Sequence, residues 1–279
     1  MCGIAGYLTF NHIPIEKHDL TTMICRLSHR GPDGEGMEVR DNVGIGHRRL
    51  SIIDLATGQQ PMFNEDRQVA VTYNGEIYNF QELVKQLELR GHVFQTRSDT
   101  EVIVHAWEEW GQACVERFRG MFAFAIVDWR QRVIFLARDQ LGIKPLYYLH
   151  HSDRFAFASE LQALRCLPNL QLRLDLQAID QYLRLRYIPA PRTAFQQICK
   201  LPPAHRMMVT FDGQMFGPEE YWRLEFRPDH NRSEADWLEA LDAVLRDSVR
   251  AHLVSDVPFG AFLSGGVTQA PLWPIWPKF

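Results

Sequence analysis

The sequence predicts an α+β fold with largely antiparallel sheets. Four apolar runs bounded by short turns have the pattern of hairpin strands: Met121 to Trp129, Val133 to Arg138, Leu146 to His150 and Arg154 to Ser159. Gln81 to Leu89 and Val102 to Arg117 instead carry apolar residues at helical spacing, so two helices are expected to cover one face of the sheets. The 279 residues are 46% hydrophobic, which suffices for one large domain and part of a second.

The N-terminal strand, Ile4 to Leu8, follows a cysteine at position 2. Removal of Met1 would leave a thiol and a free α-amine on the same residue, Cys2. A thiol ionises near pH 8.5 and an α-amine at about 7.7 to 8.0, so the amine can accept the thiol proton near neutral pH. The amine can later protonate a leaving group. The pattern therefore indicates an N-terminal nucleophile, and an ordinary thiol is the alternative.

Two segments in the middle of the chain combine local structure with candidate chemistry. The strand Val69 to Tyr73 leads into Asn74-Gly75, a dipeptide typical of hairpin turns, and such a turn would present a side-chain amide and a backbone N–H together. Ser98-Asp99-Thr100-Glu101 opens the periodic run of the next helix and is typical of a helix cap with an acidic first turn. His29 and His47 are expected to be structural, because the α-amine makes another base unnecessary.

The last third of the chain indicates a connection and a second domain. Prolines interrupt the pattern from Ile188 onward, and the connection is expected to run to about residue 233. A helix is predicted for Glu234 to Leu253 and an apolar strand for Val257 to Leu263. No internal repeat is evident.

Charge and cysteine usage exclude several classes of protein. The net charge is −4 and the basic residues are dispersed, which argues against nucleic-acid binding. No stretch approaches the roughly 18 consecutive apolar residues of a membrane span, and no signal-peptide pattern begins the chain. The five cysteines lack metal-type spacing, so no metal site is expected, and a reduced, cytoplasmic location is predicted. Cys25 and Cys114 fall in helical patterns and are expected in the core.

Eight sequence motifs follow one another along the chain: His29 to Asp33, Gly46 to Asp54, Tyr73 to Asn79, Ser98 to Glu101, Gly120 to Ala125, Ala137 to Tyr148, Phe157 to Glu160 and Lys200 to His205. Their order and spacing resemble those of class II glutamine amidotransferases, and of glutamine-dependent asparagine synthetases in particular. The resemblance covers residues 1 to about 267 and implies the four-layer αββα sandwich of N-terminal nucleophile hydrolases.

The resemblance implies a role for each matched residue in glutamine hydrolysis. Cys2 would attack the side-chain amide to form a thioester, and Asn74 and Gly75 would stabilise the oxyanion. A planar guanidinium suits the α-carboxylate of glutamine, and acidic side chains would balance its α-ammonium. The expected glutamine-binding residues are Arg49, Leu50, Ile52, Glu76 and Asp99.

The same resemblance divides the chain into a glutaminase domain at 1–190, a connecting segment at 191–233 and the start of an α/β ATP-pyrophosphatase-like synthetase domain at 234–267. The expected remnant of the ATP loop comprises Leu263, Ser264, Gly265 and Gly266. Residues 268–270 read Thr-Gln-Ala where the family has Asp-Ser-Ser. If the Val267 codon ends in G, moving the reading frame back by one base permits Asp-Ser-Ser, so residues 268–279 are expected to be an aberrant, frameshifted tail. A natural short variant is the alternative.

These features predict a glutaminase that acts on L-glutamine without a cofactor. An intact parent would use ATP and Mg²⁺ to activate aspartate and pass ammonia to it, an activity that this chain is not expected to complete. One alternative is a parent that amidates a sugar or polysaccharide; another is an inactive fragment. Gln140 stands where the family pattern has His or Arg. The sequence does not indicate an oligomeric state.

Overall fold

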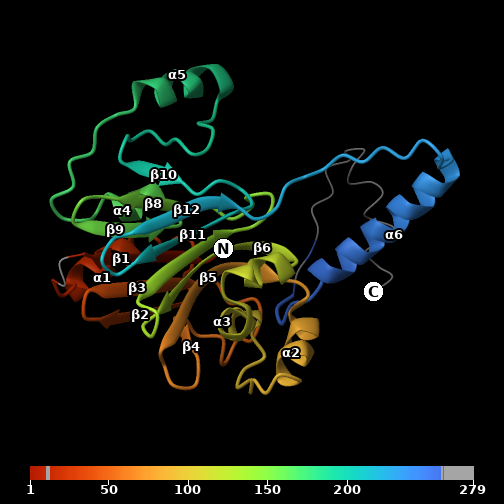
Figure 1. Ribbon diagram of the computed structural model, residues 1–279, viewed down its shortest axis with the longest axis horizontal. Coiled ribbons are helices and arrows are strands. Elements are labelled where there is room, and N and C mark those ends of the chain that lie inside the picture. Colours follow the sequence, from red (N-terminus) through yellow and green to blue (C-terminus); the bar gives the residue numbers. More distant parts are fainter. Residues whose placement is uncertain (11–12, 259, 261–279) are drawn as a thin grey trace. The chain divides into compact units, whose positions relative to one another are not determined.

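The first of two six-stranded antiparallel sheets contains the N-terminal strand (Figure 1). The computed structural model describes residues 1–10, 13–258 and 260. In this sheet β1 lies between β3 and β9, and it pairs antiparallel with both. The backbone that follows Cys2 is therefore held on both sides. In sheet order the strands are β10 (Ile198–Lys200), β8 (Tyr147–His150), β9 (Arg154–Ala158), β1 (Gly3–Thr9), β3 (Val43–Arg49) and β2 (Gly34–Arg40).

The second sheet is built around the hairpin of β6 and β7. The two central strands are continuously apolar, because both of their faces are covered. In sheet order the strands are β12 (Met215–Glu220), β11 (His205–Thr210), β7 (Val133–Arg138), β6 (Gly120–Asp128), β5 (Val69–Ile77) and β4 (Met62–Phe63). The strands predicted between residues 121 and 159 are confirmed.

Helices cover the outer face of each sheet and an apolar core fills the space between the sheets. Side chains such as Leu8 and Ile45 from the first sheet pack with Ala125 and Ile134 from the second. The resulting order is helix, sheet, sheet, helix, which confirms the αββα sandwich. The helices are α1 (Lys17–Cys25) and α4 (Leu161–Leu164) on the first sheet, α3 (Asp99–Trp110) on the second with α2 (Phe80–Glu88) against it, and α5 (Leu176–Leu185).

The predicted hairpin turn at Asn74-Gly75 is wrong, because β5 continues through both residues to Ile77. Asn74 and Gly75 pair with Ala123 and Phe122 of β6. Glycine is needed here for close approach: a Cβ on Gly75 would lie 2.3 Å from the carbonyl oxygen of Met121. Pairing with a distant strand thus outweighs the local turn preference of the dipeptide.

Two further local predictions need correction. The helix predicted for residues 102–117 begins earlier, at Asp99, and ends at Trp110, where Gly111 has a φ of 55° and a 3₁₀ helix (Gly111–Arg117) follows. Cys25 is exposed at the last position of α1, where its Sγ lies 3.7 Å from Nη2 of Arg48, whereas Cys114 is buried as expected.

The segment expected to be a connection, residues 191–233, contributes β10, β11 and β12 to the two sheets. The chain forms two compact units, Met1–Arg223 and Leu224–Phe279. The second contains α6 (Glu234–His252), which confirms the predicted helix to within one residue, and a capping box of Ser233 and Asp236 begins it. Most of the predicted strand 257–263, the residues Leu263 to Gly266 and the tail 268–279 lie outside the described residues. Within the described ranges, no helix combines the length and apolarity needed to cross a membrane.

Candidate active site

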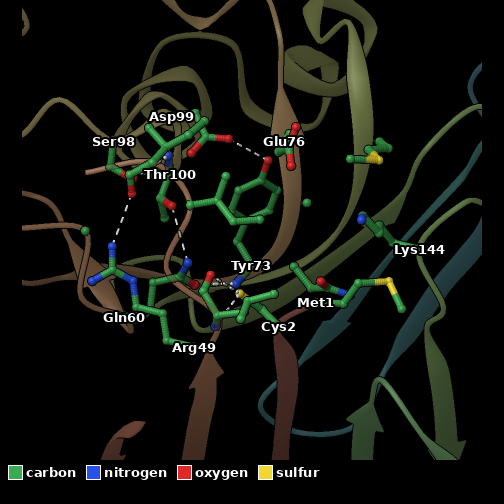
Figure 2. A pocket seen from close by; sticks show the side chains of 17 residues that line it. Met1, Cys2, Arg49, Gln60, Tyr73, Glu76, Ser98, Asp99, Thr100 and Lys144 are labelled. Carbon is green, nitrogen blue, oxygen red and sulfur yellow. Dashed lines mark hydrogen bonds between the residues drawn. The ribbon is translucent and has the colours of Figure 1, made fainter. Parts of the chain in front are cut away.

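A pocket of about 260 Å³ opens beside the N-terminus (Figure 2). Sites for drug-sized ligands have roughly 300 to 1,000 Å³, so this volume indicates a small ligand. The pocket brings together every residue expected at a glutaminase site, although they come from four separate segments. These residues are Cys2, Arg49, Leu50, Ile52, Asn74, Gly75, Glu76 and Asp99. The expected ATP-loop residues are outside the described part of the chain.

Cys2 is held by its neighbours through both its thiol and its backbone. The Leu50 backbone N–H lies 3.4 Å from Sγ, and Arg30 Nε donates to the Cys2 carbonyl over 2.9 Å. Arg30 Nη1 in turn donates to Glu160 Oε1 over 2.9 Å. Arg30 and Glu160 belong to two of the matched motifs, so both motifs help to hold Cys2 in place. Burial raises the pKa of the Cys2 thiol, so it needs a base to ionise at neutral pH.

The α-amine at the chain terminus lies in the same pocket. Met1 lines the pocket beside Cys2 and Lys144 (Figure 2). Burial lowers the pKa of the Met1 amine, which increases its free-base fraction near neutral pH. The surroundings of the terminus therefore favour an amine that accepts protons.

Asn74 carries an unsatisfied donor. Its side chain is 1% exposed, and among the described residues Nδ2 has no hydrogen-bond partner. A buried amide without a partner costs about 1–3 kcal/mol, so such groups are rare unless they serve a function. Because Asn74 and Cys2 line the same pocket, an oxygen atom of a bound ligand is the natural acceptor.

Arg49 places a buried positive charge at the pocket. Its guanidinium donates to the main-chain carbonyls of Ile53, Asp54 and Leu55. The loop packs closely here: a Cβ on Gly58 would lie 2.4 Å from Nη2 of Arg49. These main-chain carbonyls fix the guanidinium beside the pocket, where its positive charge suits an anionic ligand.

Asp99 serves the helix and the pocket together. Ser98 caps α3 through its side chain, as predicted. The Asp99 carboxylate instead accepts hydrogen bonds from Tyr73 Oη at 2.8 Å and from the Ile77 backbone N–H at 2.9 Å. Burial is the main cause that raises the pKa of Asp99 to about 6, and the charge of Glu76 adds to it. The carboxylate is therefore an ionised but poorly solvated group at neutral pH, suited to bind a cation.

Gln60 and Lys144 are among the polar pocket residues that the sequence did not predict as site residues. Gln60 bridges β5 and α3, because its Oε1 accepts from the Tyr73 N–H at 2.7 Å and its Nε2 donates to Thr100 Oγ1 at 3.3 Å. Lys144 is 6% exposed, and burial lowers its pKa. The position of Lys144 within the matched motif Ala137 to Tyr148 was a sequence signal that could have identified it as a pocket residue. No local sequence pattern indicates Gln60.

Other candidates lie away from the pocket lining. His47 is buried on β3 with Nε2 3.0 Å from the Tyr73 carbonyl oxygen, and burial lowers its pKa to about 3. His29 contacts Glu160 at 3.0 Å. Both geometries agree with structural roles. Gln140 donates to the Phe118 carbonyl at 3.2 Å, a local contact outside the pocket.

Two helix-covered antiparallel sheets and a cysteine beside the N-terminus, facing a small polar pocket, define the N-terminal nucleophile class of glutamine amidotransferase. The chain belongs to the glutamine amidotransferase domain family, which matches residues 1–222. The asparagine synthase family matches residues 240–268 as well. The predicted family membership is confirmed.

Two individual relatives and one solved structure agree with this family assignment. The chain is 38% identical to asparagine synthetase (glutamine-hydrolyzing) 1 of Bacillus subtilis (strain 168), over 97% of this chain and 43% of the relative. It is 33% identical to a putative asparagine synthetase (glutamine-hydrolyzing) 2 of Methanocaldococcus jannaschii, over 100% of this chain and 57% of that relative. The chain thus spans about half the length of these curated relatives. The solved glutamine phosphoribosylpyrophosphate amidotransferase of B. subtilis shares the fold, with a TM-score of 0.56 and 21% identity over 77% of this chain and 48% of that one.

Proposed function

We propose that this pocket hydrolyses the side-chain amide of glutamine to glutamate and ammonia, with Cys2 as the nucleophile. The observation that supports this most directly is the buried Nδ2 of Asn74, which has no partner among the described residues and lines the same pocket as the Cys2 thiol. A donor that is unsatisfied before the reaction can bind the charge that develops during it, without prior rearrangement.

The chemistry follows from the groups at the terminus. Hydrolysis of the Met1–Cys2 peptide bond releases Met1 and leaves a free α-amine on Cys2, and this amine takes the thiol proton. The thiolate attacks the amide carbon, a C–S bond forms, and the oxyanion is stabilised by Asn74 Nδ2 and the Gly75 N–H. The amine then protonates the nitrogen, which leaves as ammonia when the C–N bond breaks. Water attacks the thioester and releases glutamate and the thiol.

Binding of the amino-acid end explains the remaining charges. In the proposal Arg49 binds the α-carboxylate, and Glu76 and Asp99 bind the α-ammonium. Figure 2 shows Asp99 and Glu76 at one end of the pocket and Cys2 at the other. A substrate that spans the pocket thus has its ammonium near the acids and its side-chain amide near the thiol. Leu50 and Ile52 supply apolar contacts to the methylene groups between them.

We further propose that a longer protein of this family passes the ammonia to aspartate activated by ATP and Mg²⁺. The match to the asparagine synthase family and the names of the relatives support this acceptor. The expected ATP contacts, Leu263 to Gly266, lie outside the described residues. The reaction proposed for this chain therefore ends with glutamate and ammonia and requires no cofactor.

The proposal is tested by products and by covalent labelling. The purified 279-residue chain is incubated with glutamine, and glutamate and ammonia are expected in equal amounts. A diazoketone analogue of glutamine should alkylate Cys2, and peptide mass spectrometry should find the label on an N-terminal peptide that lacks Met1. A folded, processed chain that neither releases ammonia nor takes up the label contradicts the proposal, as does a label on another cysteine.

Asp99→Asn is expected to stabilise the protein and weaken glutamine binding. Because the folded-state pKa of about 6 lies above the ordinary value of 3.8, the folded state binds the proton more tightly. The free energy of unfolding therefore falls as the pH rises from about 3.8 to about 6, and the full destabilisation by the ionised Asp99 is present above pH 6. At pH 8 the free energy of unfolding of the variant should be about 1–3 kcal/mol higher than that of the unmodified protein. Its KM for glutamine should rise on the order of 10- to 100-fold.

The matched control is Asp180→Asn on α5, where the exposed carboxylate pairs with Arg184. A surface pair of this kind contributes about 0–1 kcal/mol, so neither stability nor KM should change much. Denaturant titration at pH 5 and pH 8 and steady-state kinetics measure both effects. An Asp99→Asn variant with an unchanged KM would show that Asp99 does not contact the substrate.

A further inference from the structure

Three candidate metal ligands meet on the second sheet's helical layer, away from the pocket described above. His92 lies in the segment after α2, and His105 and Glu108 lie on α3. Nδ1 of His92 is 3.3 Å from Nδ1 of His105, which is 3.5 Å from Oε2 of Glu108. All three ligand atoms lie within 4.8 Å of one another. The three groups therefore converge on a single point in space.

Their spacing fits a tetrahedral ion. Zinc binds imidazole nitrogen and carboxylate oxygen at about 2.0–2.2 Å, which places neighbouring ligand atoms about 3.3–3.6 Å apart. Two of the three separations have this length. His105 and Glu108 are three positions apart on one helix and so share a face. His92 is fixed by its backbone N–H, which donates to the Leu87 carbonyl at 3.1 Å.

Each ligand also has an outer partner on its far side. His105 Nε2 is 3.6 Å from Glu101 Oε1, and His92 Nε2 is 3.5 Å from Glu109 Oε2. Asn64 Nδ2 donates to Glu108 Oε1 over 2.7 Å, which leaves Oε2 facing the imidazoles. Carboxylates behind histidines and hydrogen bonds behind carboxylates are the usual supports of metal ligands, because they fix tautomer and orientation.

We propose that His92, His105 and Glu108 bind one divalent transition-metal ion of the Zn²⁺ type. Two imidazoles and one carboxylate suit zinc or cobalt, whereas Mg²⁺ and Ca²⁺ prefer sets made of oxygen alone. The ligands are histidine and glutamate, so cysteine spacing gave no indication of the site. Three protein ligands leave one position for water.

A bound ion would join the segment before Ser98 to the helix that begins at Asp99. The same segment is already attached to α3, because Glu101 accepts from the backbone N–H groups of Gln95 at 2.8 Å and Thr96 at 2.7 Å. Glu101 also faces His105. The site thus supports, from outside, the elements that carry the acidic end of the pocket. A proton shared by Nδ1 of His92 and Nδ1 of His105 would also hold these two atoms close together. A metal titration distinguishes this protonated state from a metal-bound state.

The test uses the full chain without a polyhistidine tag, in a Cys2→Ala background that removes the proposed nucleophile as a competing ligand. Cobalt(II) is titrated and followed by its visible absorption, then displaced by zinc, with the thermal midpoint measured in parallel. We expect one ion per chain, a higher midpoint, and no thiolate-to-cobalt charge-transfer band. His92→Ala should remove saturable binding, and Glu109→Gln should weaken it about 10- to 100-fold.

His18→Ala is the matched control, because His18 is exposed on α1 and should leave cobalt binding unchanged. Glu108→Gln provides a second ligand variant if His92→Ala folds poorly. The proposal is overturned if the folded chain shows no saturable cobalt binding, if binding persists in both ligand variants, or if a thiolate band appears. The same ligand variants made in the chain that keeps Cys2 provide the activity readout, and loss of metal binding with normal glutamine hydrolysis there would separate this site from the proposed activity.

Discussion

Replacing Cys2 with alanine should lower kcat/KM for glutamine hydrolysis by at least about 10⁴-fold, the size of effect seen when an enzyme loses its nucleophile. Alanine at position 2 keeps the α-amine and the backbone contact to Arg30, so only the thiol is removed. The Leu50 N–H loses a weak sulfur acceptor, and stability should change little. Steady-state assays of ammonia release and the midpoint of thermal unfolding measure the two effects.

Cys166→Ala is the control for this prediction. Its thiol is partly exposed, donates to the Gln162 carbonyl one turn earlier and lies outside the pocket lining, so full activity is expected. Mass spectrometry of both variants must show that Met1 is absent, because retention of Met1 would block the amine. More than about 1% residual activity in a processed Cys2→Ala chain would falsify the assignment of the nucleophile.

Asn74→Ala should reduce kcat by about 10²- to 10³-fold with little change in KM, as expected for loss of one oxyanion donor. The ground-state amide is not the group that this donor binds best, which is why the loss appears in kcat. Folding should be preserved, since Nδ2 makes no hydrogen bond within the described residues. Burst kinetics with a glutamine ester can show whether thioester formation is the slowed step.

Asn42→Ala separates this effect from the loss of any buried asparagine. Asn42 is similarly buried, but its Nδ2 donates to the Thr9 carbonyl at 2.7 Å. The control should therefore lose about 1 kcal/mol of stability and keep its kcat. If instead Asn74→Ala unfolds easily and Asn42→Ala does not, Asn74 has a structural partner and the oxyanion assignment fails.

Much of the fold followed from pattern. The strands between residues 121 and 159 show clean apolar runs with short turns, and α6 shows a helical period with a capping box, so their limits could be predicted. The sequence-based predictions failed where contacts between distant residues determine the local structure. Asn74-Gly75 has the composition of a turn yet lies inside β5, because β6 offers a complete ladder of partners. Gly111 ends α3 within a segment whose periodicity alone suggests a longer helix.

The sequence by itself determined the chemistry available to this protein, because the thiol of Cys2, the fork of Arg49 and the carboxylate of Asp99 belong to the side chains. Only the tertiary structure decided how these groups behave. Packing of two sheets and a helix buries the thiol and raises its pKa, raises that of Asp99 to about 6, and leaves Asn74 Nδ2 without a partner among the described residues. Burial and pairing depend on contacts between residues far apart in the chain, which no local pattern encodes.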